Sequence, residues 1–351
     1  MTLQSSGTIR WSEIRDEFGA NVGGTGVSLG RYRNSDSNFG NKNVGTLSNL
    51  PLDVGVPTSG TISASSFYSK RLNMVLDMYD TRTIGTEFRV NCRTRYNDSS
   101  KVKVVGGYRS RPSNTDNTRV IVNVNKTIGS DTNTVNTVAV RTGGWGSDCD
   151  LEFEIGSNGK LYGAGGNGGD GGSANGSGGG NGSNGSTALG VEYSCTINNL
   201  GRIQSGYGGG GGGGGRREYR RSGKKSGRWV GSSGGGGGGG AGVQDSPGWW
   251  SSNGGDSPSD AYGGGSNGSD GGNGVDVTSG SGGAGGAEGG AGGNGGAVNN
   301  SSTSGSAGAS AGGSGGSGGA NGYAIITTQG SLPSISGNAV IGRTQTSGSI
   351  T

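Results

Sequence analysis

The chain has 351 residues, of which 88 are glycine, and only 27% are hydrophobic. Ordinary globular domains contain about 7% glycine and roughly 45–50% apolar residues, so one conventional core cannot order this whole chain. The net charge of +4 is too modest to indicate a general nucleic-acid binder. Histidine is absent, which removes the commonest general base and metal ligand. We therefore expect a protein that is not an enzyme and holds no cofactor or metal.

The lengths of the apolar runs and the number of cysteines exclude further classes of protein. The apolar runs are much shorter than the ~20 residues of a membrane-spanning helix, so we expect no membrane insertion. The three cysteines, Cys92, Cys149 and Cys195, cannot form a fully paired disulfide framework and lack the spacing of a zinc site. We expect them to be buried free thiols.

A short repeat marks the N-terminal region, residues 1–83. Residues 6–14 and 59–67 share the pattern Ser-Gly-Thr-Ile-x-x-Ser-x-Ile/Phe. The second serine of each copy is suited to cap a short helix, which predicts one helix over about 12–18 and another from about Ser65. Helices this short are unstable alone, so we expect this region to attach to a larger partner.

Residues 84–155 show a β pattern. Polar and apolar residues alternate there, and polar turns follow about every ten residues, which is typical of a small β-sandwich. One inward face per strand gives a thin core, so we expect the chain to form a homotrimer. Strands are expected at 87–93, 101–105, 119–125, 135–140 and 151–155.

Two further patterns lie near the end of this segment. Residues 155–161 and 197–203 share Ile-x-x-x-Gly-Lys/Arg-Leu/Ile, which predicts a short hairpin in each copy. Four acidic residues also alternate there, which places them on one face of a strand. A solvated strand edge explains such a face, and an oxygen-rich calcium site is the alternative. The four are Asp148, Asp150, Glu152 and Glu154.

Glycine dominates residues 156–322, and two stretches repeat Gly-Gly-x, at 289–297 and 312–320. A polyproline II helix has three residues per turn and no internal hydrogen bonds, so each x falls on one side while glycine backbones can bond to neighbouring helices. The pattern predicts a stack of polyglycine II helices, with the pure runs 208–215 and 234–240 inside it. A flexible Gly/Ser linker is the alternative.

Asn-Gly steps such as Asn184-Gly185 predict turns between these helices. Residues 323–351 return to Ile, Val and Thr, and they predict a strand that anchors the stack. The expected fold is mainly β plus polyglycine II helices. Its parts are a short helical attachment region (1–83), a small β-sandwich (84–155), a glycine-rich helix stack (156–322), and a C-terminal strand and tail (323–351).

Segments beside the pure glycine runs carry charge and aromatic rings. Residues 216–229 lie between the runs, and their cations and rings suit an anionic, sugar-rich surface. A solvated loop whose charge prevents self-association is the alternative. Trp249 and Trp250 follow the second run, as a hydrophobic plug or as a glycan platform. The candidate binding residues are Arg216, Arg217, Tyr219, Arg220, Arg221, Lys224, Lys225, Arg228, Trp229, Trp249, Trp250 and Tyr262.

Short motifs resemble tail-fibre proteins of tailed bacteriophages. They are the two Ser-Gly-Thr-Ile repeats, the second ending Phe67-Tyr68-Ser69-Lys70, and Asn158-Gly159-Lys160-Leu161-Tyr162-Gly163 before the glycine runs. The glycine region looks like the polyglycine-sandwich adhesins at the fibre tips of T-even-like phages. That resemblance implies contact with the host through loops 216–229, 245–250 and 256–262. It does not include residues 84–155, because those adhesins lack such a β domain.

The resemblance implies a virion tail protein that attaches to the host bacterium and is assembled in the host cytoplasm. Its partners would be other tail or baseplate proteins through residues 1–83, its own copies, and a host surface glycan or outer-membrane protein, but no nucleic acid. A purely structural tail or baseplate component without receptor contact is the alternative. An ice-binding protein and a disordered RNA binder fit less well, because the x positions vary and the Arg-Gly-Gly repeats of such RNA binders are missing.

Overall fold

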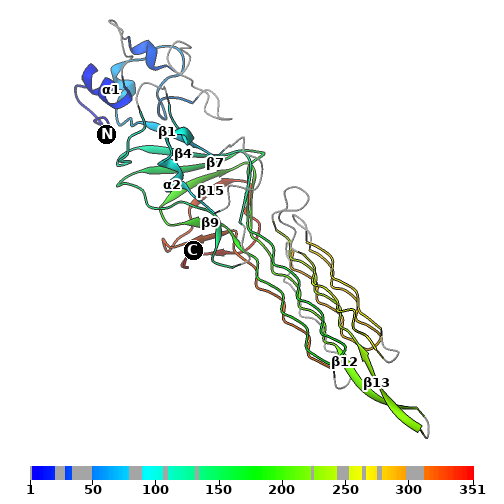
Figure 1. The fold of residues 1–351 in the computed structure, drawn as a ribbon. Coiled ribbons are helices and arrows are strands. Elements are labelled where there is room, and N and C mark those ends of the chain that lie inside the picture. Colours follow the sequence, from blue (N-terminus) through cyan, green and yellow to red (C-terminus); the bar gives the residue numbers. More distant parts are fainter. Residues whose placement is uncertain are drawn as a thin grey trace.

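The computed structural model is elongated (Figure 1). Short helices of the N-terminal region lie at one end, the larger sheets follow, and the strands β12 and β13 lie at the other end. The C-terminus lies beside the larger sheets. The structure describes residues 2–19, 28–33, 50–78, 89–105, 110–130, 134–222, 225–242, 253–262, 266–274, 279–297 and 312–351.

The described part is mainly β, as the sequence predicts, and its helices are short. None of the helices in these ranges is long and apolar enough to cross a membrane. In chain order the elements are α1 (Trp11–Phe18), η1 (Leu29–Tyr32), η2 (Ala64–Phe67), β1 (Asn73–Asp77), β2 (Val90–Asn91), α2 (Cys92–Tyr96), η3 (Ser99–Lys101), β3 (Val102–Val104), β4 (Arg119–Val124), β5 (Thr127–Gly129), β6 (Val138–Arg141), β7 (Asp150–Ile155), β8 (Lys160–Tyr162), β9 (Thr187–Val191), β10 (Cys195–Asn199), β11 (Arg202–Gln204), β12 (Arg216–Ser222), β13 (Lys225–Ser232), β14 (Ile325–Thr327), β15 (Ser334–Gly337) and β16 (Thr344–Gln345).

Three sheets surround a shared apolar core. Their strand orders are β15-β10-β7-β4-β1-β3, β11-β8-β5 and β16-β14-β9-β6-β2. Every neighbouring pair in them is parallel except β1 with β3, which is antiparallel at one edge. Parallel strands cannot be joined by tight hairpins, so the chain must cross elsewhere between them.

The chain crosses through the other two sheets, and so it winds as a β-solenoid. β4, β5 and β6 form one turn, and β7, β8 and β9 form the next. β10, β11 and β14 form a third turn. A fourth consists of β15, residue Ile341, which bridges to Gln204 of β11, and β16.

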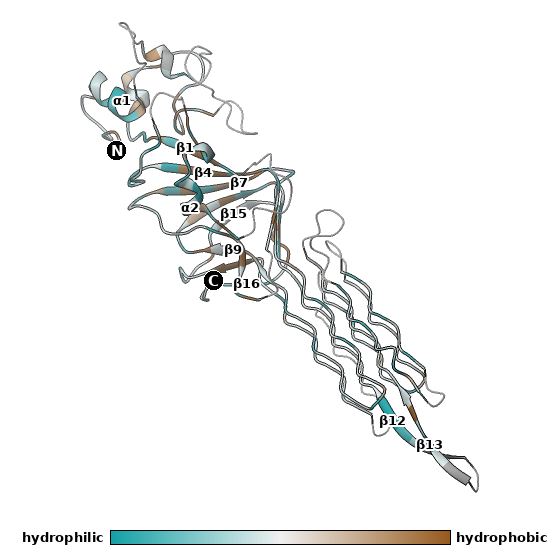
Figure 2. Ribbon diagram, viewed as in Figure 1, coloured by the Kyte–Doolittle hydropathy of each residue, from teal (hydrophilic) through white to brown (hydrophobic). Residues whose placement is uncertain are grey.

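Apolar side chains stack from one turn to the next inside the solenoid. Val122, Phe153 and Ile197 occupy matching positions of β4, β7 and β10 and are buried. Figure 2 shows the strongly hydrophobic residues in these sheets, whereas the glycine-rich segments are pale and β12 is hydrophilic. No single turn can bury its apolar face alone, but stacking gives a continuous core within one chain. The thin core that motivated the trimer is therefore not observed, and the number of copies stays a prediction.

This arrangement is not the small sandwich predicted for residues 84–155. β1 precedes that segment and β9, β10 and β14 follow it, yet all of them share its sheets. The alternating pattern located β3, β4, β6 and β7 but carries no information on which strands pair or in which direction. The strand expected at 87–93 is instead β2 followed at once by α2, where Asn91 Oδ1 accepts from Thr94 N at 3.1 Å.

The repeat at 155–161 and 197–203 does not form hairpins. β7 and β8 lie in different sheets, as do β10 and β11. β8 and β11 are parallel neighbours, with Lys160 opposite Arg202 and Leu161 opposite Ile203. The repeat therefore marks equivalent corners of successive solenoid turns.

The glycine-rich segments are insertions at one position in two neighbouring turns. Residues 163–186 connect β8 to β9, and the chain from 205 to 324 connects β11 to β14. Their described parts outside β12 and β13 are here called the glycine stack. At its base Ser186 N donates to Ala164 O at 2.9 Å, and Gly322 N donates to Gly206 O at 2.8 Å. Residues 187–204, inside the predicted glycine-rich domain, thus belong to the sheets, and the division into four domains stays a prediction.

The backbones of the glycine stack bond to one another with a period of three residues. Each amide from Gly234 to Ala241 donates to a neighbouring segment over 2.8–3.1 Å. A backbone with three residues per turn presents its amides to three neighbours in this alternating order. Gly234, Gly237 and Gly240 donate to Gly172, Gly169 and Gly166; Gly235, Gly238 and Ala241 donate to Gly290, Gly293 and Gly296; Gly236 and Gly239 donate to Ser269 and Gly272.

Burial within the stack follows the predicted pattern. The pure runs 208–215 and 234–240 are buried along their whole length, as predicted for inner segments. In the Gly-Gly-x stretches the x residues face outward: Ala291, Asn294 and Ser317 are exposed, whereas Gly293 and Gly316 are buried. In these stretches the small or polar x residues therefore lie where a side chain reaches solvent.

Outer asparagines of the stack accept backbone hydrogen bonds through their side chains. Asn181 Oδ1 accepts from Ser317 N at 2.8 Å, and Asn184 Oδ1 accepts from Ala320 N at 2.8 Å. The turn predicted at Asn184-Gly185 is therefore wrong, because both residues lie in an extended segment. The asparagine side chain bonds to the neighbouring segment instead of folding its own backbone.

The short N-terminal helices pack within their own chain. The ring centroids of Phe18 and Tyr32 each lie 5.8 Å from that of Phe67. Glu17 is buried, and its carboxylate accepts from Leu72 N at 2.7 Å. The second expected helix is only the single 3-10 turn η2. Another subunit is thus not needed to cover these helices.

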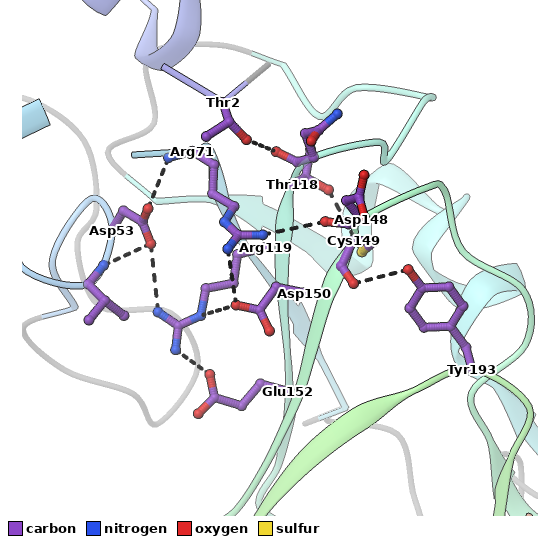
Figure 3. Close-up of polar contacts among 12 residues, drawn as sticks. Thr2, Asp53, Arg71, Thr118, Arg119, Asp148, Cys149, Asp150, Glu152 and Tyr193 are labelled. Atoms are coloured by element: carbon purple, nitrogen blue, oxygen red, sulfur yellow. Dashed lines mark hydrogen bonds and ion pairs between the residues drawn. The ribbon is translucent and has the colours of Figure 1, made fainter. Parts of the chain in front are cut away.

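Figure 3 shows a charged cluster where the N-terminal region meets the sheets. Arg119 pairs with Glu152, and its guanidinium lies 3.7 Å from Asp53 Oδ1 and 3.9 Å from Asp150 Oδ2. Arg71 Nη2 lies 3.8 Å from the same Asp150 oxygen, and Arg71 N donates to Asp53 Oδ2 at 2.9 Å. Acidic groups of the central strand β7 thus help to hold the N-terminal region.

The acidic row of β7 is therefore not a solvated sheet edge, because β4 and β10 flank this strand. Glu154 Oε2 accepts from Asn198 Nδ2 at 2.9 Å. Burial, reinforced by the neighbouring Glu152, raises the pKa of Glu154. Within the described ranges, no three His, Cys, Asp or Glu residues are grouped so that they could hold a metal ion.

The three cysteines are free and buried, as the sequence predicts. Burial raises the pKa of Cys149 to about 11 and that of Cys195 to about 12. They stay protonated at neutral pH and pack as apolar side chains in the core.

The close backbone contacts predict that alanine substitutions at two glycines differ sharply in their effect on stability. A Cβ at Gly237 would lie 2.1 Å from Gly210 O, whereas a Cβ at Gly272 would come no closer than 3.4 Å to Ser281 N. We expect Gly237→Ala to lower the free energy of unfolding by about 1–3 kcal/mol or more through overpacking. Gly272→Ala, the matched control, should be nearly neutral. Thermal unfolding of both variants measures this, and equal effects would contradict the packing.

An ion pair on the solenoid predicts a pH effect. Arg141 Nε donates to Glu192 Oε2 at 2.9 Å, and this bond lowers the pKa of Glu192. The folded-state pKa lies below the unfolded value of about 4.3, so the stabilisation exists above that pH and is lost as the pH falls through the folded-state pKa. Because both groups are partly exposed, Glu192→Gln should cost less than about 1 kcal/mol at pH 7. Urea unfolding should show the cost shrinking in acid; a cost that grows in acid contradicts the assignment.

Candidate functional site

β12 and β13 form an antiparallel hairpin, here called the tip hairpin, at the end of the glycine stack farthest from the larger sheets (Figure 1). β12 follows the run 208–215 and β13 precedes the run 234–240, so both strands continue buried glycine segments. Tyr219 lies opposite Trp229, and the register shifts between Arg220 and Ser222. The charged loop expected at 216–229 is thus a strand pair with a defined orientation.

One side of the tip hairpin, the aromatic face, carries Tyr219, Trp229, Tyr262 and Arg217. The rings of Tyr219 and Trp229 meet edge-on with centroids 5.2 Å apart. The guanidinium carbon of Arg217 lies 4.3 Å from the centroid of the Trp229 ring. Tyr219, Trp229 and Tyr262 are 46%, 48% and 36% exposed, so the face combines large rings with a cation at the surface.

Tyr262 joins this face from another part of the chain. It bridges to Gly231 of β13, and each backbone N of this pair donates to the other residue's O at 3.1 Å. Its segment also contacts the turn after Gly172, because Asp260 Oδ1 accepts from Ala174 N at 3.0 Å. The tip hairpin, the segment that ends at Tyr262 and the turn after Gly172 therefore meet at this end of the stack.

Two glycines of β13 leave room for the tyrosine rings. A Cβ at Gly227 would lie 2.5 Å from Tyr219 Cε1, and a Cβ at Gly231 would lie 2.4 Å from Tyr262 Cε1. Residues 227, 229 and 231 share one side of the strand because strand side chains alternate. Trp229 therefore stands between two tyrosine rings, each of which lies over a glycine.

The opposite side of the hairpin fixes it to the stack. Arg216 is only 8% exposed and pairs with Glu218 of its own strand. Its Nη1 also lies 2.6 Å from Glu288 Oε2, in a turn of the 279–297 segment. The charge of Arg216 is thus engaged inside the protein, although the sequence analysis included it among the surface-binding residues.

The structure brings together several of the candidate binding residues. Arg217, Tyr219, Trp229 and Tyr262 share the aromatic face, and Arg228 is exposed on the same hairpin. The backbones of Arg220, Arg221 and Lys225 belong to the strands, but their side chains lie outside the described part. Lys224, Trp249 and Trp250 lie outside the described residues altogether.

Sequence reasoning missed Gly227, Gly231 and Glu288. Each had a signal: the two glycines flank Trp229 at alternate positions, and Glu288 is the only charged residue of the segment 279–297. In a glycine-rich sequence these glycines did not stand out, and the partner of Glu288 lies far away in the chain.

The Arg216 pair predicts how firmly the hairpin is held. Glu288→Gln removes one carboxylate from the buried guanidinium, and hydrogen bonds to charged groups contribute about 1.5–3 kcal/mol. We expect trypsin to cleave the hairpin of this variant severalfold faster than that of the wild type. Ala287→Ser, one residue earlier on the exposed side, is the control. Identical cleavage rates for Glu288→Gln and wild type would show that the pair does not hold the hairpin.

Comparison with protein-family models matches residues 87–350 to the family described as phage tail fibre adhesin Gp38. Comparisons with curated proteins and with solved structures found no match. The matched residues run from β2 to β16, so they include the solenoid strands of 84–155 that the initial resemblance left out. The chain therefore belongs to the phage tail fibre adhesin Gp38 family and is a virion tail protein with a role in attachment to the host bacterium.

Proposed function

We propose that this adhesin contacts the host surface through the tip hairpin, without catalysis. The observation that carries the proposal is the placement of an exposed aromatic and cationic face at the end of the molecule farthest from its N-terminal region (Figure 1). Aromatic and arginine side chains dominate the energetics of binding surfaces. A host surface glycan or an outer-membrane protein is the partner at this site.

We further propose that the glycine stack consists of polyglycine II helices. The three-residue period of its lateral hydrogen bonds and the outward x positions support this assignment. Such a lattice holds the tip hairpin in one orientation before the host is met. Binding then costs less conformational entropy than it would for a flexible Gly/Ser loop.

The other end is proposed to join the rest of the tail. The described residues before β1 lie at the end opposite the tip, and Asp53 among them pairs with Arg119 of β4. Forces on the tip would therefore pass through the stack and the solenoid to this region. Assembly as a homotrimer remains a proposal, and sedimentation of the purified chain measures the number of copies.

The exposed arginines of the hairpin provide the test. We expect the double variant Arg217→Ser/Arg228→Ser to slow adsorption of phage to host cells about tenfold or more, most strongly at low salt, because cations steer association with an anionic surface. Lys101→Ser/Lys103→Ser changes the net charge equally near β3 and serves as the control. Adsorption is measured as the loss of free phage with time. Equal rates for both variants and wild type would favour a purely structural tail role.

A further inference from the structure

We infer that the aromatic face binds an anionic saccharide of the bacterial surface and that Gly227 positions Tyr219 for this contact. The inference rests on the proposed function, because it requires the tip hairpin to meet the host. It adds the ligand class and a positioning residue that the proposed function does not contain.

Exposed large side chains cluster on this face. In the described part of the chain, three of the six exposed large hydrophobic residues are Tyr219, Trp229 and Tyr262. The other three, Val54, Leu200 and Leu332, are scattered over separate segments outside the glycine stack. Isolated exposed apolar residues are ordinary, whereas a contiguous patch marks a binding surface.

Each ring of the face is held in place by the protein. Tyr219 lies over Gly227, Tyr262 lies over Gly231, and Trp229 is in contact with Tyr219 and Arg217. Rigid rings offer a large contact area at a small cost in conformational entropy. Their electron-rich faces attract the weakly positive C–H groups that cover the flat sides of sugar rings.

The charge on this face selects an anion. Arg217 is exposed, and its guanidinium carbon lies over the Trp229 ring, 4.3 Å from the ring centroid. From there the planar guanidinium can bind a carboxylate or a phosphate with two hydrogen bonds. Glu218, the acidic residue of the hairpin, pairs with Arg216 on the other side and does not oppose such a ligand.

The face offers a saccharide aromatic rings and a cation. Gly227 and Gly231 carry no side chain, and tyrosine rings cover their positions, so these positions add no aliphatic side chain to the described face. A chain of acidic sugars can lie across such a surface.

Gly227 allows a clean test of ring position. The atoms nearest to a Cβ at Gly227 all belong to the Tyr219 side chain, at 2.5–2.7 Å, so Gly227→Ala displaces that ring alone. At Gly231 a Cβ would also lie 2.3 Å from Ala174 O, so a substitution there would move the backbone as well.

The experiment uses the full chain, fluorescently labelled, on an array of purified bacterial lipopolysaccharides and of acidic and neutral capsular polysaccharides. The same protein is applied to cells of a permissive strain before and after protease treatment. We expect binding to acidic but not neutral polysaccharides and undiminished binding to protease-treated cells. Trp229→Ala and Gly227→Ala should each weaken binding about tenfold or more, with Leu200→Ala as an exposed control and unchanged melting temperatures.

The outcomes separate the two levels of the proposal. The assignment of an anionic saccharide as the ligand is overturned if binding disappears after protease treatment. It is also overturned if binding does not distinguish acidic from neutral polysaccharides. In both cases the hairpin remains the proposed contact with the host. Wild-type binding by Gly227→Ala beside a loss in Trp229→Ala overturns the positioning role. If Gly227→Ala acts through Tyr219, the double variant Tyr219→Ala/Gly227→Ala should bind like Tyr219→Ala alone. Normal binding by Trp229→Ala and by Arg217→Ser/Arg228→Ser would remove the hairpin from the site, and with it the proposed function.

Discussion

The distal half of this adhesin depends on hydrogen bonds between backbones that have no side chains between them. At most inner positions a Cβ would lie about 2 Å from a neighbouring carbonyl, for example 1.9 Å from Asp170 O at Gly212, so glycine is required by contact. Ordering a residue costs about 1–2 kcal/mol and a hydrogen bond returns a net of about 1 kcal/mol. The lattice is therefore stable only when other parts of the protein fix its ends. The solenoid strands β8, β9, β11 and β14 hold its base, and Arg216 with Glu288 ties the tip hairpin to it.

The residues that build the lattice are therefore different from those proposed to bind the host. Inner segments have no freedom of sequence, because each glycine is enclosed by other backbones. The outer x positions accept small or polar residues, and asparagines there complete the bonding of neighbouring amides. In the described part of this distal half, the exposed large hydrophobic side chains are Tyr219, Trp229 and Tyr262, all at the tip, where they do not disturb the lattice. Under the proposed function, host specificity can therefore change in the tip hairpin without rebuilding the stack.

Much of the distal region could be predicted from the sequence, because the Gly-Gly-x period reports directly on which residues face outward. The buried pure runs and the strands β3, β4, β6 and β7 follow from equally local patterns. The solenoid could not be predicted, because its turns differ in spacing and two of them are interrupted by glycine insertions. Leu151 aligns with Cys195, whereas Lys160 aligns with Arg202, so no constant repeat length runs through the turns. Only part of the aromatic face could be predicted from the sequence. The roles of Gly227 and Gly231 depend on the rings of Tyr219 and Tyr262, which come from other segments of the chain.

Lateral amide bonds order the glycine segments. Hydrogen–deuterium exchange on the intact chain tests this ordering most directly, with peptides covering residues 208–215 and 234–241. We expect these amides to exchange orders of magnitude more slowly than those of an unstructured glycine peptide, and as slowly as the amides of β4 and β7. Exchange at the rate of the unstructured peptide in both segments, with the solenoid still protected, would contradict it.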